Sequence, residues 1–107
     1  MLKARMEIQF TLAGKNYING KHPLRPAFSF GDGLLFSGNI ISDHSEYLQG
    51  ETYIVDVEFF TIEDEAYNVL QSRLTKGMGL TICTGKQILG IATLLGFAYE
   101  EAGVLLK

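Results

Sequence analysis

The residue types that most often carry chemistry are sparse in this chain, and they do not form a catalytic constellation. Its 107 residues include a single cysteine, Cys83, and two histidines, His22 and His44. Nucleophilic catalysis needs a nucleophile, a base and a group that orients the base, and a zinc site needs several Cys or His ligands at set spacings. Cys83 has no second cysteine, and each histidine lies in polar turn sequence without a metal-spaced partner. We therefore expect no catalytic residues, no metal site and no cofactor.

A glycine-containing stretch, residues 79–87, has some features of a phosphate-binding loop. Five residues separate Gly79 from Gly85-Lys86, whereas the phosphate-binding motif has four. Gln87 also stands where that motif needs a metal-binding Ser or Thr. The sequence therefore predicts no nucleotide site.

The carboxylates are concentrated in the middle of the chain. The formal net charge is −3, but residues 32–65 contain nine Asp and Glu and no Lys or Arg, whereas the segments on both sides carry net positive charge. Such a segment can form an acidic surface that attracts a basic protein and repels phosphate backbones. The alternative is that a barrel scatters these residues, so that their field averages out and the strand carboxylates are simply solvated. The carboxylates that we predict as a protein-interaction surface are Asp56, Glu58, Glu63, Asp64 and Glu65.

Most of the chain consists of segments in which apolar and other residues alternate, the pattern of β-strands, and these predicted strands must position the charged side chains. The stretch 47–61 shows this pattern after a turn at Gly50, and we expect every other apolar run to pair with it or pack against it. Gly38 inside another such run predicts a bulge or a close backbone approach. Similar alternation predicts five further strands, at 6–12, 28–30, 34–40, 78–84 and 87–95.

One helix is expected among the strands. Apolar residues recur at helical spacing from Ala66 to Leu74, Thr61 to Asp64 has the spacing of a capping box, and Gly77 is a plausible C-terminal stop. These features predict a helix over about Glu63–Thr75. Residues 96–107 fit either a terminal helix or an added strand.

The length and composition favour a single all-β domain covering residues 1–107. Twelve glycines interleaved with 47% hydrophobic residues suit short strands and tight turns. No apolar run approaches the roughly 20 residues that a membrane span needs, and residues 1–10 lack the apolar centre and cleavage site of a signal peptide. We therefore expect a soluble, cytoplasmic protein without a membrane partner.

Four stretches, in order, resemble the C-terminal β-barrel of elongation factor Tu and related translation factors. Residues 24–30 (LRPAFSF) look like the family's strand with Arg-Pro before Phe-x-Phe, and residues 36–40 (FSGNI) look like its Thr-Gly-x-Ile strand. Residues 48–51 (LQGE) are similar to its Met-Pro-Gly-Asp turn, and residues 80–94 (LTICTGKQILGIATL) to its closing hairpin. The match extends from about Ala4 to Leu95.

This resemblance implies a closed six-stranded antiparallel barrel with the predicted helix inserted. It implies no GTPase activity, because that activity belongs to another domain of the factor. In the family the barrel contacts aminoacyl-tRNA, and the positions matching its RNA-facing motifs are Arg25, Gly85 and Lys86.

Two function hypotheses follow. In the first, the barrel is a non-catalytic module that binds a protein, such as a basic toxin neutralised by an immunity protein, or a translation component. In the second, it binds tRNA or another RNA through Arg25, Lys86 and the basic first third of the chain. Because phosphate contacts supply most RNA affinity, the cation-free middle segment favours protein binding.

Overall fold

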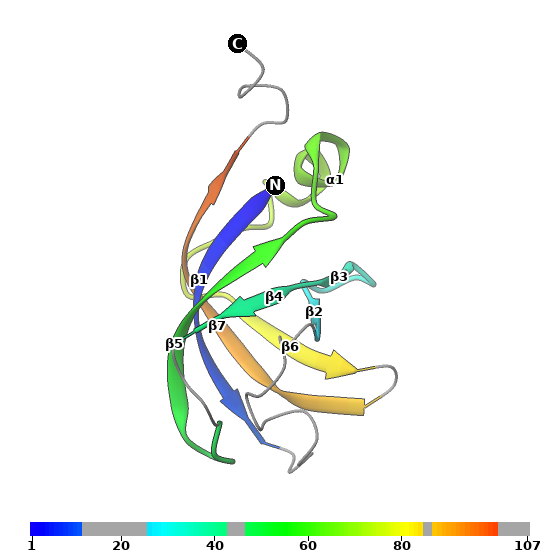
Figure 1. The fold of residues 1–107 in the computed structure, drawn as a ribbon. Helices are drawn as coiled ribbons and strands as arrows, with labels where there is room; N and C mark the ends of the chain where they lie inside the picture. Colours follow the sequence, from blue (N-terminus) through cyan, green and yellow to red (C-terminus); the bar gives the residue numbers. More distant parts are fainter. Residues whose placement is uncertain (12–25, 43–46, 85–86, 101–107) are drawn as a thin grey trace.

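A computed structural model describes residues 1–11, 26–42, 47–84 and 87–100, and Figure 1 shows the fold. These residues form seven strands and one short helix, which confirms the predicted all-β class. The elements are β1 (Leu2–Phe10), β2 (Ala27–Ser29), β3 (Leu35–Ser37), β4 (Asn39–Ile41), β5 (Thr52–Phe59), α1 (Asp64–Leu70), β6 (Gly79–Thr84) and β7 (Gln87–Tyr99).

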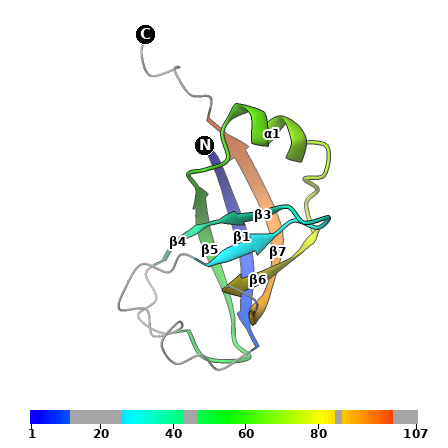
Figure 2. The same ribbon diagram turned by 90° about the vertical axis from the view of Figure 1, so that its right-hand side faces the viewer.

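The seven strands form one antiparallel sheet in the order β3-β2-β6-β7-β1-β5-β4. β3 and β4 stand at opposite ends of this order, yet only Gly38 separates them in the chain. They therefore act as one bent strand that pairs with β2 through its first half and with β5 through its second (Figure 2). This connection joins the two ends of the sheet into a nearly closed barrel. It also explains why six predicted strands appear as seven.

The centre of the sheet differs from the expectation that the strand within 47–61 organises the fold. β5 pairs with β1 along its length but with β4 over only three residues. β1 instead pairs with β5 on one side and with the 13-residue β7 on the other. β1 begins at Leu2, four residues before the predicted start, so the first residues of the chain lie in the middle of the sheet.

Gly38 lies where the barrel closes, because the space that a side chain would need there is filled. A Cβ atom on Gly38 would lie 2.7 Å from Val57 Cγ1 and 2.8 Å from Phe28 Cε1. The Gly38 N–H donates to the Pro26 carbonyl at 2.9 Å and so continues the β2–β3 pairing. The sequence predicted a bulge or a close backbone approach at this position; the structure instead shows close contact with the side chains of Val57 and Phe28.

Gly38→Ala is expected to lower the free energy of unfolding by about 1–3 kcal/mol, because the new methyl group overpacks the barrel interior. Urea unfolding followed by circular dichroism measures the loss. Combining it with Val57→Ala removes one of the clashing groups. The double variant should therefore lose less stability than the sum of the two single losses, by at least about 0.5 kcal/mol. Strictly additive losses would show that the clash is not the cause.

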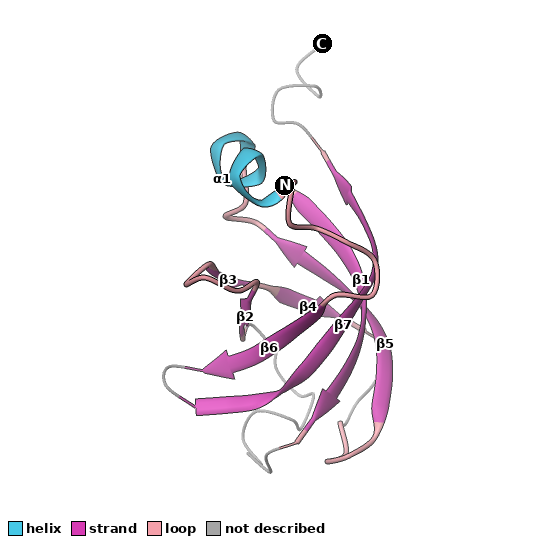
Figure 3. Ribbon diagram, turned by 180° about the vertical axis from the view of Figure 1, so that it is seen from behind, coloured by secondary structure: helices cyan, strands magenta, loops and turns pink. Residues whose placement is uncertain are grey.

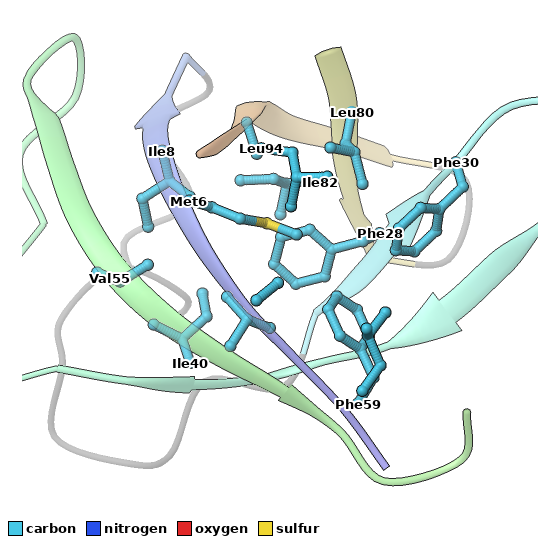
Figure 4. Packing of buried hydrophobic residues seen from close by; sticks show 14 of the residues in the cluster. Met6, Ile8, Phe28, Phe30, Ile40, Val55, Phe59, Leu80, Ile82 and Leu94 are labelled. Atoms are coloured by element: carbon cyan, nitrogen blue, oxygen red, sulfur yellow. The ribbon is translucent and has the colours of Figure 1, made fainter. Parts of the chain in front are cut away.

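Apolar side chains from the strands fill the barrel interior and form one hydrophobic cluster. Figure 4 shows the centre of this cluster. Met6, Phe28 and Ile82 are fully buried there, and no polar or charged side chain of the described residues is buried. The Phe59 ring meets the rings of Phe28 and Phe30 edge-on, with centroids 5.3 and 5.5 Å apart. Such edge-to-face contacts add to the stabilisation that comes from burial alone.

α1 covers the end of the barrel where β1 begins and β7 ends (Figure 2). Its only buried residue is Leu70, and Ile62 and Leu74, just outside the helix, are buried as well. The helix is shorter than the predicted Glu63–Thr75. Arg73 N–H donates to the Leu70 carbonyl at 2.8 Å, so a turn replaces the next helical bonds while Leu74 still reaches the core.

The predicted capping box is also wrong. The residue at the N-cap position is Glu63, and no side chain caps the helix; Thr61 lies in the preceding turn. Gly77 has φ +90°, as its predicted role requires, but it turns the chain towards β6 rather than ending the helix. Residues 96–99, left open between helix and strand, continue β7, and residues 101–107 lie outside the described residues.

Candidate functional site

A groove of about 500 Å³ lies on the outer face of β7, β1, β5 and β4. Figure 3 shows β7, β1 and β5 side by side from behind. Four charged residues line the groove, Lys3 and Arg5 from β1 and Asp56 and Glu58 from β5. Apolar groups complete it, including Ile41 of β4. The groove therefore combines both signs of charge with an apolar edge.

Antiparallel pairing brings these charges together. The residue directly opposite Arg5 on β5 is Asp56, and the residue opposite Lys3 is Glu58. Paired residues of an antiparallel ladder lie on the same face of the sheet, so each cation faces an anion. The positive first strand and the acidic middle segment, separate in the sequence, are thus neighbours on the surface.

The Arg5–Asp56 pair has the geometry of a two-point contact. Arg5 Nε donates to Asp56 Oδ1 at 3.0 Å and Nη2 donates to Oδ2 at 3.4 Å. The hydrogen bond to Asp56, with the charge of that carboxylate, raises the pKa of the Arg5 guanidinium. Both side chains remain more than half exposed, so the pair is accessible from solvent.

Lys3 lies between two carboxylates. Its Nζ is 3.0 Å from Glu100 Oε1 and 3.9 Å from Glu58 Oε2. The hydrogen bond from Lys3 to Glu100 and the charge of Glu100 raise the pKa of the Lys3 ammonium, and the Glu58 charge acts in the same direction. Glu100 is a partner that the sequence analysis did not include, because the conformation of residues 96–107 was left open there.

The remaining predicted carboxylates gather where α1 begins. Glu63 Oε2 lies 3.1 Å from the amino group of Met1, and Asp64 accepts a hydrogen bond from the Tyr99 hydroxyl. The Tyr99 ring stacks on Tyr67 of α1, with centroids 4.0 Å apart. These contacts fix the start of α1 against the ends of β1 and β7. We call the exposed carboxylates of this region the acidic end: Glu63, Asp64, Glu65 and Glu100.

The structure therefore divides the predicted acidic residues between the outer face of the sheet and the end of the barrel that α1 covers. Asp56 is paired with Arg5, and Glu58 shares Lys3 with Glu100, whereas Glu63, Asp64 and Glu65 belong to the acidic end. Sequence reasoning missed Lys3 and Arg5 as site residues because it grouped them with the whole basic first third. The signal was present, since Lys3, Arg5 and Glu7 alternate with apolar residues from Leu2 onward.

The predicted RNA-facing residues Arg25, Gly85 and Lys86 lie outside the described residues. Among the residues that are described, no group of three or more His, Cys, Asp or Glu side chains could hold a metal ion. Cys83 is half-buried, with Sγ 3.9 Å from the Thr81 carbonyl. No helix of the described chain is long and apolar enough to cross a membrane.

Comparison with known proteins adds no family assignment. No protein-family model matches the chain, and no curated protein matches it significantly. The nearly closed barrel agrees with the fold that the elongation factor resemblance implies, but the resemblance itself stays a prediction.

Proposed function

We propose that the chain is a non-catalytic binding module, a barrel of the elongation factor Tu type that docks a basic protein through its acidic end. An immunity protein that covers the basic cleft of a toxin is one concrete form of this function, and a translation component is the other partner we consider. Cytoplasmic action fits both forms.

The charge balance at the acidic end is the observation that carries this proposal. The acidic end contains four carboxylates, and the ion pairs among the described residues supply it with the Met1 amino group at Glu63 and with Lys3 at Glu100, a cation that it shares with Glu58 of the groove. The other groove anion, Asp56, has Arg5 as its own partner. The Glu63 and Glu100 side chains are each more than half exposed. An exposed surplus of one sign accelerates encounter with a partner of the opposite sign and disfavours phosphate backbones.

Partner capture with charge-reversed variants tests the proposal. Wild-type protein immobilised in native host lysate should retain a basic protein in stoichiometric amount. The variant Glu63→Lys/Glu65→Lys should retain at least about tenfold less of this protein, because the two new lysines carry the same positive charge as the basic partner and repel it. Mass spectrometry identifies and quantifies the bound protein.

The matched control is Glu7→Lys, which makes the same kind of charge change on the exposed outer face of β1, away from α1. It should capture as much partner as the wild type. A partner retained equally by the Glu63→Lys/Glu65→Lys variant would contradict the proposal. So would micromolar tRNA binding that weakens with salt and is lost in Arg25→Ala, since that pattern belongs to an RNA-binding protein.

A further inference from the structure

The groove face contains two cross-strand rows with the same chemical order. In the first row, Gly96, Arg5, Asp56 and Ile41 lie side by side across β7, β1, β5 and β4. In the second row, the same strands contribute Ala98, Lys3, Glu58 and Asn39. In each row, β7 contributes a small residue, β1 a cation, β5 an anion and β4 a larger residue.

This order is self-complementary. A two-fold axis that runs along the strands between β1 and β5, in front of the sheet, reverses the order of the strands in a facing copy. Arg5 then faces Asp56 of the second copy, and Lys3 faces Glu58 of the second copy. The pairing occurs twice, because an isologous interface contains every contact in both directions.

The ends of the first row fit each other in size. The same axis places Ile41, which is 46% exposed, opposite Gly96 of the second copy. A Cβ atom built on Gly96 would have no atom within 4 Å, so the surface above this glycine is open. An exposed isoleucine and an open glycine therefore meet on both sides of the charge pairs.

We infer that this face binds a second copy of the chain, forming a two-fold dimer in which the β1 cations of each copy pair with the β5 anions of the other. A partner carrying a single sign of charge fits less well, because it would be repelled by one of the two strands of charge. Glu100 of the acidic end contacts Lys3, but neither row contains a residue of the acidic end. Substitutions at Arg5 and Asp56 therefore test the dimer, and substitutions at Glu63 and Glu65 test the proposed function.

The dimer should be weak, because each copy contributes two rows of four residues, whereas a stable interface usually contains roughly 20–30 residues a side. We expect a Kd of about 10–100 μM, which sedimentation velocity over a concentration series up to about 1 mM measures. Arg5→Asp places a carboxylate against Asp56 of the facing copy, and Asp56→Arg places a guanidinium against Arg5. Each variant alone should raise the Kd at least about 30-fold, because two like-charge contacts arise per dimer.

Mixing the Arg5→Asp and Asp56→Arg variants gives the most stringent test of the dimer. In a mixed dimer the two reversed residues face each other with opposite signs, and the unchanged Arg5 of one copy faces the unchanged Asp56 of the other. An equimolar mixture should therefore dimerise about as well as the wild type. A wild type that stays monomeric, variants with an unchanged Kd, or a mixture that stays monomeric would each overturn the inference. Because Arg5 and Asp56 are both more than half exposed, thermal unfolding should confirm that both variants remain folded.

A size-based variant tests the same interface without changing charge. Gly96→Leu fills the open surface opposite Ile41 and should raise the Kd about tenfold or more. Gly79→Leu, at another glycine with open space above it, is the matched control and should leave the Kd unchanged. Equal effects of the two substitutions would argue against the predicted contact.

Discussion

Gly90→Ala is expected to prevent stable folding, because no space exists for a side chain where β7 pairs with the end of β1. A Cβ atom at this position would lie 2.2 Å from the Gln9 carbonyl oxygen and 2.9 Å from Phe10 Cα. Both atoms belong to the backbone of β1, which is held on both sides by pairing with β5 and β7. Neither atom can move without breaking one of these ladders. We expect a loss of about 3–5 kcal/mol, a large part of the stability of a domain of this size.

Chemical denaturation followed by circular dichroism measures the loss, or its absence. Gly79→Ala is the matched control, since a Cβ atom on Gly79 has no neighbour within 4 Å and Gly79 also lies in a strand. Its stability should change by less than about 1 kcal/mol. If Gly90→Ala were as stable as Gly79→Ala, the close approach of β7 to β1 would be wrong.

Phe59→Ala should cost about 3–5 kcal/mol of unfolding free energy. The ring is completely buried and makes edge contacts with Phe28 and Phe30, so truncation leaves a cavity lined by aromatic rings. The backbone around this site cannot easily collapse into the space, because Phe59 is paired with Leu2 in the sheet. Urea unfolding gives the loss directly.

The adjacent phenylalanine provides an unusually close control for this substitution. Phe60 has the same side chain but is 54% exposed, so Phe60→Ala should lower the stability by less than about 1 kcal/mol. The difference between the two variants isolates burial from residue type. Similar losses for both would mean that the alternation of β5 does not decide which ring enters the core.

Strand alternation was predictable because a pleated strand turns successive side chains to opposite faces whatever it pairs with. Val55, Val57 and Phe59 are buried as expected, and Ile54 and Asp56 are exposed. The turn at Gly50, which has positive φ, was predictable because glycine adopts this backbone conformation without a steric clash. The helix boundaries were predicted poorly, because burial of Leu74 by a turn looks the same in sequence as burial by a helix.

The candidate site was predictable only in part. The five carboxylates were named from the charge distribution, and the structure places two of them in the groove and three at the start of α1. The ion-pair partners of these carboxylates could not be predicted from the sequence. Arg5 and Asp56, for example, are 51 residues apart and become neighbours only through the pairing of β1 with β5. The groove, its two charge rows and the match of Ile41 with Gly96 all depend on that pairing.

By itself, then, the order of residues determined which side chains face inward, where the chain turns and which segments carry charge, since each of these depends on neighbours a few positions away. Tertiary structure alone decided which strands lie next to each other, and hence that a basic strand cancels two of the acidic residues while the acidic end keeps its surplus. The reason is that electrostatic interaction depends on distance in space, and the barrel brings together residues that the sequence separates.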